Sequence, residues 1–185
     1  MPQHQTNITA LTAADAALYR ELMLEAYEQA ADAFTSTAEE RVKEPLAWWV
    51  HRIAPPSGLG QSFGAYLEGR LVGAVALEYS AKPKTRHAAH VLGMYLQPVA
   101  RRSGAAAGLM RAVIEAANAR PEVQMLRLTV TEGNEPAIRL YRAMGFSAWG
   151  TEPNAILTPT GFRAKVHMSL MLRDGAAQPD PLPLA

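Results

Sequence analysis

The chain has 185 residues, a formal net charge of +1 and no cysteine. This length is enough for one domain with a buried core, and the near-zero charge argues against nucleic-acid partners and acidic membrane surfaces. Disulfides and thiolate metal sites are excluded, and no metal site is expected.

The N-terminus shows no basic-then-apolar leader, and no apolar run in the sequence reaches the length of a membrane span. We therefore expect a soluble, cytoplasmic protein without a membrane partner.

Strand and helix patterns alternate in the first third of the chain. Residues 7–11 indicate a short strand, after which Thr12 can cap an amphipathic helix. A Ser/Thr cap with Glu39 or Glu40 in the first turn predicts a second helix, which ends near Ile53.

The middle of the chain predicts a hairpin and then one crossover. Residues 62–80 form the hairpin, with its turn at Glu68–Gly69. An apolar strand over 87–96, a helix over 104–119 and an alternating strand over 125–133 follow. The two strands that flank this helix should be parallel and close together.

In the last part, Asn134 can cap a helix that runs through Ala143, and residues 164–172 alternate as a closing strand. These elements predict an α/β fold with a mixed sheet flanked by helices, as a single domain over residues 1–173. The proline-rich residues 174–185 are expected to form a disordered tail.

The junction between the strand over 87–96 and the next helix carries an unusual charge pair. Arg101 and Arg102 stand before Ser103-Gly104 and a run of alanines. Free amides at a helix start favour anions, small side chains let a ligand approach, and the arginines can add charge-assisted contacts. The pattern therefore describes a phosphate cradle, although a strand-to-helix loop with solvated charges explains the same residues equally well.

Two motifs make this region resemble the GNAT superfamily of acyl-CoA-dependent N-acetyltransferases. The patterns Arg/Gln-x-x-Gly-x-Gly/Ala and Asn-x-x-Ala-x-x-x-Tyr occur in order within residues 87–146, separated by one helix and one strand. Many relatives carry glycines at the positions of Ser103 and Ala106, so the chain departs from them there. The matched residues are Arg101, Gly104 and Ala106 for the first motif, and Asn134, Ala137 and Tyr141 for the second.

The resemblance implies a mostly antiparallel sheet in which two parallel strands splay apart, with acetyl-CoA as the cofactor between them. In this family a primary amine attacks the thioester directly and takes up the acetyl group. For this chain we expect the amine to belong to a small molecule or a peptide. Gly93 could mark the bulge that relatives show, or a close packing contact. The cradle and the resemblance together assign cofactor binding to Met94, Tyr95, Leu96, Arg101, Arg102, Ser103, Gly104, Ala105, Ala106, Asn134, Ala137 and Tyr141.

The resemblance also implies two catalytic residues. Tyr141 matches the tyrosine whose hydroxyl gives a proton to the leaving sulfur, although packing on Phe146 would also explain it. His90 stands where several relatives carry a glutamate that acts as a base through water. Packing on the sheet explains His90 as well, Glu78 and Glu132 are further candidates, and an amine that is already neutral needs no base.

The acceptor side is less well specified. We expect Phe34 and Glu78 to contact the acceptor, with Trp48 or Trp49 as further apolar walls. Glu39 or Glu40 could attract a cationic amine, although each of these residues also fits a structural role. Alternative functions are a non-catalytic acyl-CoA-binding module and acetylation of a macromolecular amine. Pairing of two copies through a sheet edge, giving a homodimer, rests on analogy alone.

Overall fold

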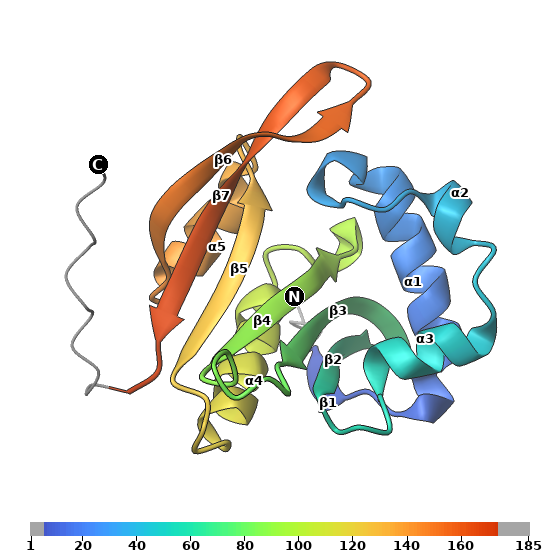
Figure 1. Ribbon diagram of the computed structural model, residues 1–185. Helices are drawn as coiled ribbons and strands as arrows, with labels where there is room; N and C mark the ends of the chain where they lie inside the picture. The colour runs from blue at the N-terminus through green and yellow to red at the C-terminus, as the bar shows by residue number, and fades with distance from the viewer. Residues whose placement is uncertain (1–5, 174–185) are drawn as a thin grey trace.

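The computed structural model describes residues 6–173, and the tail expected over 174–185 lies outside them. One seven-stranded sheet organises the chain, with the strand order β1-β2-β3-β4-β5-β7-β6 (Figure 1). The strands are β1 (Asn7–Ala10), β2 (Gly60–Leu67), β3 (Arg70–Tyr79), β4 (Ala88–Leu96), β5 (Met125–Thr131), β6 (Ser147–Thr158) and β7 (Gly161–Met171).

Five α-helices and three short 3-10 helices connect the strands. The helices are η1 (Ala13–Asp15), α1 (Ala16–Gln29), η2 (Ala31–Ala33), α2 (Ala38–Arg41), α3 (Leu46–Ile53), η3 (Pro98–Ala100), α4 (Ala105–Asn118) and α5 (Glu135–Ala143). In residues 6–173, no helix combines the length and the apolar character needed to cross a bilayer.

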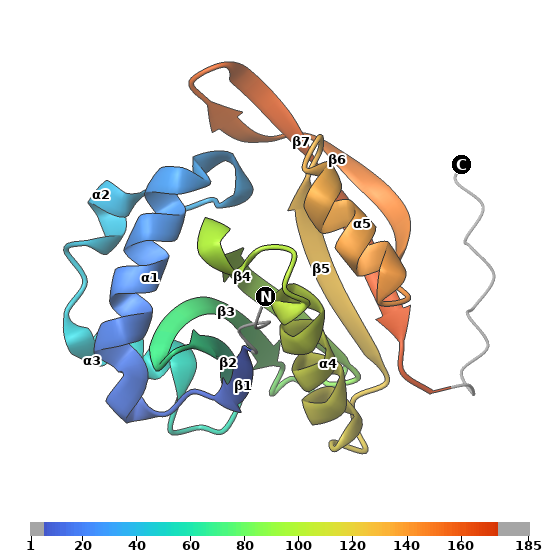
Figure 2. The ribbon, with the colours of Figure 1, turned by 180° about the vertical axis from the view of Figure 1, so that it is seen from behind.

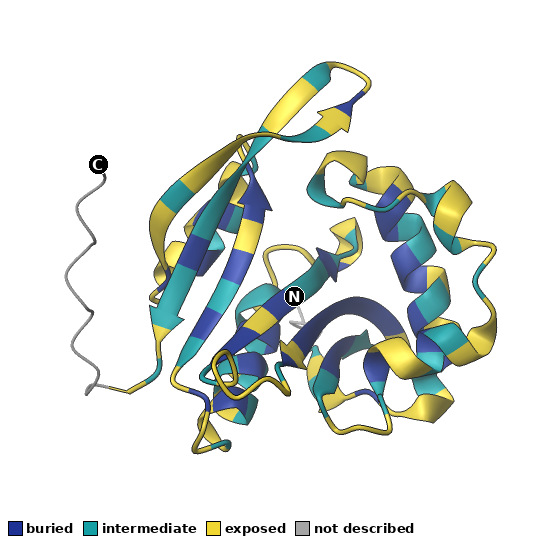
Figure 3. Ribbon diagram, in the orientation of Figure 1, coloured by how far each residue is buried: buried dark blue, intermediate teal, exposed yellow. Residues whose placement is uncertain are grey.

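The helices cover the sheet unequally. One core cluster joins α1 and α3 to one face of β3 and β4, and a second joins α4 and α5 to the opposite face (Figure 2). Strand β5 alternates as predicted, because Leu126, Leu128 and Val130 are buried in the second cluster. The other side chains of β5 face the opposite side of the sheet, where α1 and α3 cover β3 and β4. The edge strand β6 is largely exposed, whereas most residues of β7 are half-buried (Figure 3).

The sheet is antiparallel except for one short parallel pair. Strands β4 and β5 pair only from Ala88 opposite Met125 to His90 opposite Arg127, and beyond that point they diverge. This confirms the mixed α/β fold and the parallel pair that flanks α4. The divergence leaves a fork between the second half of β4 and the end of β5.

A β-bulge changes the direction of β4 at the point where the fork opens. The β3–β4 register shifts between Ala74 and Ala76, so that Gly93 and Met94 both lie opposite Val75. Gly93 has φ of 61°, in the left-handed region that glycine adopts at little cost. Of the two explanations for this glycine, the structure shows the bulge.

The segment 37–53 forms two helices, so the prediction of one continuous helix was wrong. Thr37 caps α2 as expected, but this helix ends at Arg41, and α3 begins only at Leu46. Pro45 explains the break, because it has no N–H to donate to a helix. In a continuous helix its ring would also clash with the carbonyl of Arg41 four residues earlier.

Strand β6 was not predicted from the sequence. It lies at the edge of the sheet, and most of its residues are exposed, so it lacks the alternation that marks a half-buried strand. Pro153 is compatible with an edge position, and the register with β7 shifts between Glu152 and Ile156.

Packing between β3 and β4 leads to a prediction for stability. A Cβ at Gly73 would meet the Leu96 side chain and lie 3.0 Å from the Tyr95 carbonyl oxygen, whereas one at Gly150 would meet nothing within 4 Å. We expect Gly73→Ala to lower the free energy of unfolding by about 1–3 kcal/mol, the range for overpacking. Urea denaturation should show little or no loss for the control Gly150→Ala, and equal effects at the two sites would contradict the tight packing.

Candidate active site

A cavity of about 190 Å³ lies in the fork between β4 and β5. The bulge of β4, the end of β5, α5 and α1 form its walls. Residues 33–36 after α1, one residue of α3 and one residue of β7 complete them. Of the residues predicted to bind or react, those that line this cavity are Phe34, Met94, Asn134, Ala137 and Tyr141.

Tyr141 reaches the cavity from the buried face of α5. Its ring packs at 6.0 Å from that of Phe146, so the packing role considered from the sequence is present as well. Burial raises the pKa of Tyr141 to about 12. The hydroxyl therefore keeps its proton at neutral pH and can donate it inside the cavity.

Asn134 begins α5, and its side chain caps the helix. The Ala137 amide donates to Asn134 Oδ1 at 3.4 Å, which satisfies one of the free amides of the first turn. Asn134 also lines the cavity two turns before Tyr141, so the cap fixes a polar group and the tyrosine along one side of the same helix.

The turn before α4 presents backbone amides rather than a side-chain cap. Arg102 and Gly104 are both left-handed, with φ of 63° and 85°. The Ser103 hydroxyl donates to the Ala100 carbonyl at 2.7 Å and accepts from the Ala105 amide at 3.3 Å. Within residues 6–173, the amides of residues 102–104, 106 and 107 donate to no protein group.

These free amides fit a diphosphate. A Cβ at Gly104 would meet nothing within 4 Å, so the space above the turn is open. The positive end of a helix dipole and successive unpaired amides are features that bind anions in proteins, and this turn has both. Arg101 and Arg102 lie beside it and are exposed, and Arg101 Nε donates to the Leu96 carbonyl at 3.3 Å.

The residues of β4 beyond the bulge differ in what their side chains do. Met94 lines the cavity, whereas the Tyr95 ring is buried on the α1 side, where its hydroxyl donates to Glu25 Oε1 at 2.9 Å. Burial, together with this bond and the Glu25 charge, raises the pKa of Tyr95 to about 12. Tyr95 can therefore serve a cofactor only through its backbone, and its side chain anchors β4 to α1.

His90 and Glu78 lie near the cavity but do not line it. They face each other across β3 and β4. Glu78 lines a neighbouring cavity of about 300 Å³, which shares Arg52 and Leu92 with the first. Burial and the nearby Arg127 lower the pKa of His90, while Glu78 acts in the opposite direction.

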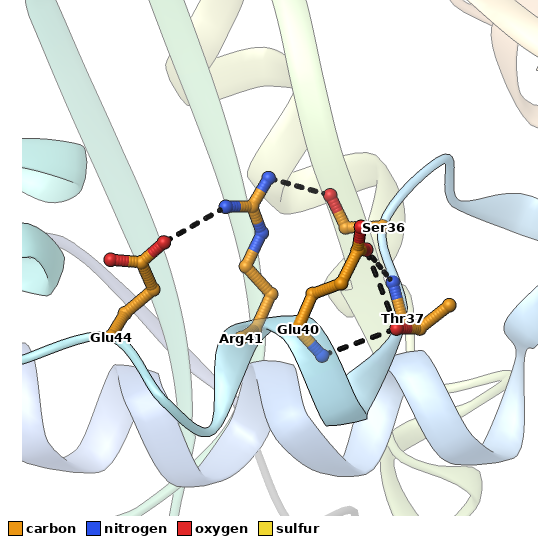
Figure 4. A network of polar contacts seen from close by, with 5 residues as sticks. All are labelled: Ser36, Thr37, Glu40, Arg41 and Glu44. Atoms are coloured by element: carbon orange, nitrogen blue, oxygen red, sulfur yellow. Dashed lines mark hydrogen bonds and ion pairs between the residues drawn. The ribbon is translucent and has the colours of Figure 1, made fainter.

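The other acceptor candidates have structural roles. Trp49 is fully buried in the α1–α3 core. Glu40 completes the capping box with Thr37, and Arg41 links Ser36 to Glu44 in the same network (Figure 4). Trp48 packs against the Arg41 guanidinium, which lies 4.7 Å from its ring centroid.

Several residues of the cavity were missed by the sequence analysis. Arg52 enters it from α3 and Lys165 from β7, and Tyr19 and Tyr27 enter from α1. Neither cation belongs to a motif, and only the tertiary fold brings these elements together. The sequence offered no signal for them.

Comparison with known proteins agrees with this geometry. A sequence model described as the acetyltransferase (GNAT) family matches residues 19–146. The chain belongs to the GNAT acetyltransferase family. This family match includes the fork, the α4 turn and Tyr141.

Individual GNAT relatives resemble the chain over different lengths. The L-amino acid N-acetyltransferase AaaT of Escherichia coli (strain K12) is 32% identical over 103 residues, which make up 56% of this chain and 62% of that protein. The structure of yncA, a putative acetyltransferase from Salmonella typhimurium solved with acetyl-CoA, matches with a TM-score of 0.76 and 20% identity, covering 95% of this chain and 99% of the other. A ribosomal-protein-alanine N-acetyltransferase from Brucella melitensis gives a TM-score of 0.73 and 24% identity, covering 89% and 99%. At these identities the two structures support the GNAT fold alone.

Proposed function

We propose that this GNAT chain is an acetyl-CoA-dependent N-acetyltransferase that acts on the primary amine of a small molecule. The observation that carries the proposal is the position of two chemically distinct features on one fork. Unpaired amides and two arginines that would suit a diphosphate lie at the α4 turn, and the cavity in the fork is lined by Tyr141, whose hydroxyl is protonated.

The chain's own residues fit the cofactor. The turn at residues 101–106 would hold the diphosphate, and the unpaired edge of β4 near Met94 would receive the pantetheine arm through main-chain hydrogen bonds. When bound, acetyl-CoA supplies an acetyl group activated as a thioester. Main-chain amides of β4 would orient the carbonyl of that group and stabilise charge on its oxygen.

Tyr141 and His90 would handle the protons. Tyr141, whose pKa is raised to about 12, keeps its proton at neutral pH and would give it to the sulfur of the departing CoA. His90 would take the proton from the amine nitrogen, through water because it lies outside the cavity lining. The neutral imidazole, which its lowered pKa favours, is the form able to do this.

A small acceptor agrees with the size of the cavity. The cavity of about 190 Å³ must also receive the acetyl end of the cofactor, which favours a small acceptor over a bulky one. The Escherichia coli relative is named as acting on L-amino acids, which are acceptors of this size. Phe34 would serve as an apolar wall, and Glu78 would be reached only by an acceptor that extends past Leu92 into the neighbouring cavity.

The proposal is tested by mixing the purified chain with acetyl-CoA and a panel of primary amines, and measuring the free thiol released. The chain contains no cysteine, so a thiol reagent reports CoA without a background from the protein. We expect amine-dependent release and an N-acetylated product in mass spectrometry. CoA binding without turnover over the panel would contradict the proposed activity.

We expect His90→Gln to lower kcat about 100-fold, within the range for removal of a general base. Because burial and Arg127 lower the pKa of His90 from 6.5, the wild-type kcat should fall only as the pH drops through this lower value. The kcat–pH profile of the variant should lack that acidic limb.

Glu78→Gln provides the control for this assignment. Glu78 raises the pKa of His90, so its removal should move the acidic limb to lower pH and leave the limb present. A His90→Gln profile that keeps both the wild-type limb and the wild-type kcat would show that His90 is not the base.

A further inference from the structure

The cavity that holds Tyr141 has a charge bias. Arg52 and Lys165 both line it. Among the residues that the structure describes, no Asp or Glu belongs to its lining. A cavity with two cations and no anion favours a ligand that brings negative charge of its own.

Arg52 differs from its neighbour Arg41 in having no counter-ion within residues 6–173. Arg41, which lies nearby, is 3.5 Å from Glu44 and donates to the Ser36 hydroxyl at 2.7 Å (Figure 4). In residues 6–173, no ion pair joins Arg52 to a carboxylate, and its guanidinium lies 5.9 Å from the Trp48 ring centroid. The groups that it contacts, the Trp48 ring and the hydrogen-bonded Tyr19 hydroxyl, are neutral, so the positive charge of this guanidinium can be matched by an anionic ligand.

The effect of Arg52 extends into the cavity. Burial raises the pKa of Tyr19 to about 12, and Arg52 is the largest influence that opposes this rise. Burial also raises the pKa of Tyr27, and the charges of Arg52 and, to a smaller extent, Arg41 oppose this rise. Both phenols line the cavity, so the positive charge of Arg52 acts at its α1 wall.

Lys165 adds a second positive charge from the opposite side of the fork. It lies on β7 opposite Thr131, and both residues line the cavity. Its nearest acidic influence is Glu152, whose carboxylate is engaged by His167 at 3.2 Å. Burial lowers the pKa of Lys165, as expected for an ammonium that the protein does not fully compensate.

Apolar side chains complete the walls. Met23 of α1, Phe34 after η2 and Leu92 of β4 line the same space as the two cations. An acceptor that suits these walls carries an amine, an anionic group and an apolar side chain within a few atoms of one another.

We infer that the acceptor is an amino acid with an apolar side chain, and that Arg52 binds its carboxylate while Lys165 adds attraction. This inference rests on the proposed acetyltransferase function and deepens it by assigning the acceptor's carboxylate to a residue. A planar guanidinium can bind a carboxylate through two parallel hydrogen bonds. Polycationic amines are disfavoured, because Arg52 and Lys165 would repel their additional charges.

The experiment compares acceptors that differ only in the carboxylate. The pairs are L-leucine with L-leucinamide and L-phenylalanine with L-phenylalaninamide, assayed by thiol release. The amides have the more readily deprotonated amine, so intrinsic reactivity opposes the expected preference. For the wild-type chain, we expect kcat/KM to be at least 10-fold higher for the acids.

Substitution of Arg52 should remove this preference. A hydrogen bond to a charged group contributes about 1.5–3 kcal/mol, so Arg52→Met should lower kcat/KM for the acids roughly 10-fold to 150-fold. The values for the amides should change less than 3-fold. Arg52→Lys should recover part of the loss, and the exposed Arg70→Met, on β3 outside the cavity, should behave as wild type.

The outcomes separate the inference from the function on which it rests. Acetylation of the amides as efficiently as the acids by the wild-type chain would overturn the carboxylate site and leave the acetyltransferase proposal standing. The wild-type ratio needs no variant, so it decides even if Arg52→Met fails to fold. CoA binding without acetylation of any member of the pairs or of the wider amine panel would overturn both.

Discussion

Replacement of Tyr141 by phenylalanine should lower kcat about 100-fold or more and leave the Kd for CoA within about 2-fold of the wild type. Loss of a general acid costs 10²–10⁴ in rate, to order of magnitude. The substitution keeps the ring, and therefore keeps the contact with Phe146 and the burial of this side of α5. Steady-state kinetics gives kcat, and titration calorimetry with CoA gives the affinity.

Tyr79→Phe is a matched control for this variant. Tyr79 is also buried, and in the part of the chain that the structure describes its hydroxyl has no hydrogen-bond partner, so its removal should cost little stability. Its ring packs under Arg120 and does not line the Tyr141 cavity. We expect both kcat and the CoA affinity of this control to stay near wild type. Parallel losses of rate and affinity in Tyr141→Phe, or an unchanged rate, would remove the proton-donor role.

Local sequence patterns predicted the half of the fold that carries the proposed cofactor side of the site. The alternation of β5 identified its buried face correctly, and Asn134 was identified as a helix cap. The α4 turn was predicted from Gly104 and its small neighbours, because a helix start without a strong side-chain cap leaves amides free. Each of these features depends on residues close together in sequence.

The acceptor side could not be predicted in this way. Arg52 and Lys165 are more than a hundred residues apart and meet at one cavity only because β7 pairs with β5 while α3 packs against α1. The strand β6 was missed because an exposed edge strand carries no hydrophobic period. Acidic side chains that suggested an acceptor site at Glu39 and Glu40 instead serve a surface ion pair and a helix cap.

Substitution of Gly104 by valine should weaken CoA binding roughly 10-fold to 150-fold, the equivalent of one hydrogen bond to a charged group. A Cβ at this position would meet no protein atom within 4 Å, so the start of the new side chain has room in the protein. The side chain would instead stand beside the free amides of residues 102–104, 106 and 107 and hinder a diphosphate there. Titration calorimetry with CoA measures the change in Kd.

Valine at Gly104 also introduces backbone strain, which could lower the stability by itself. The control variant must therefore carry the same strain. Gly69 in the β2–β3 turn has φ of 78°, close to the 85° of Gly104, and a Cβ there also meets nothing within 4 Å. Both valine variants should lose about 1–2 kcal/mol of stability from the left-handed conformation, but only Gly104→Val should lose CoA affinity.

A second ligand makes the test specific for the diphosphate. S-acetylpantetheine carries the reacting thioester without the diphosphate, so its kcat/KM should be similar in Gly104→Val and in the wild type. If kcat/KM falls for acetyl-CoA but not for S-acetylpantetheine, the α4 turn must bind the diphosphate, because strain, misfolding or a distorted fork would affect both donors. An equal loss for both donors would mean that the turn shapes the fork without binding the diphosphate, and the unpaired amides would then need another explanation.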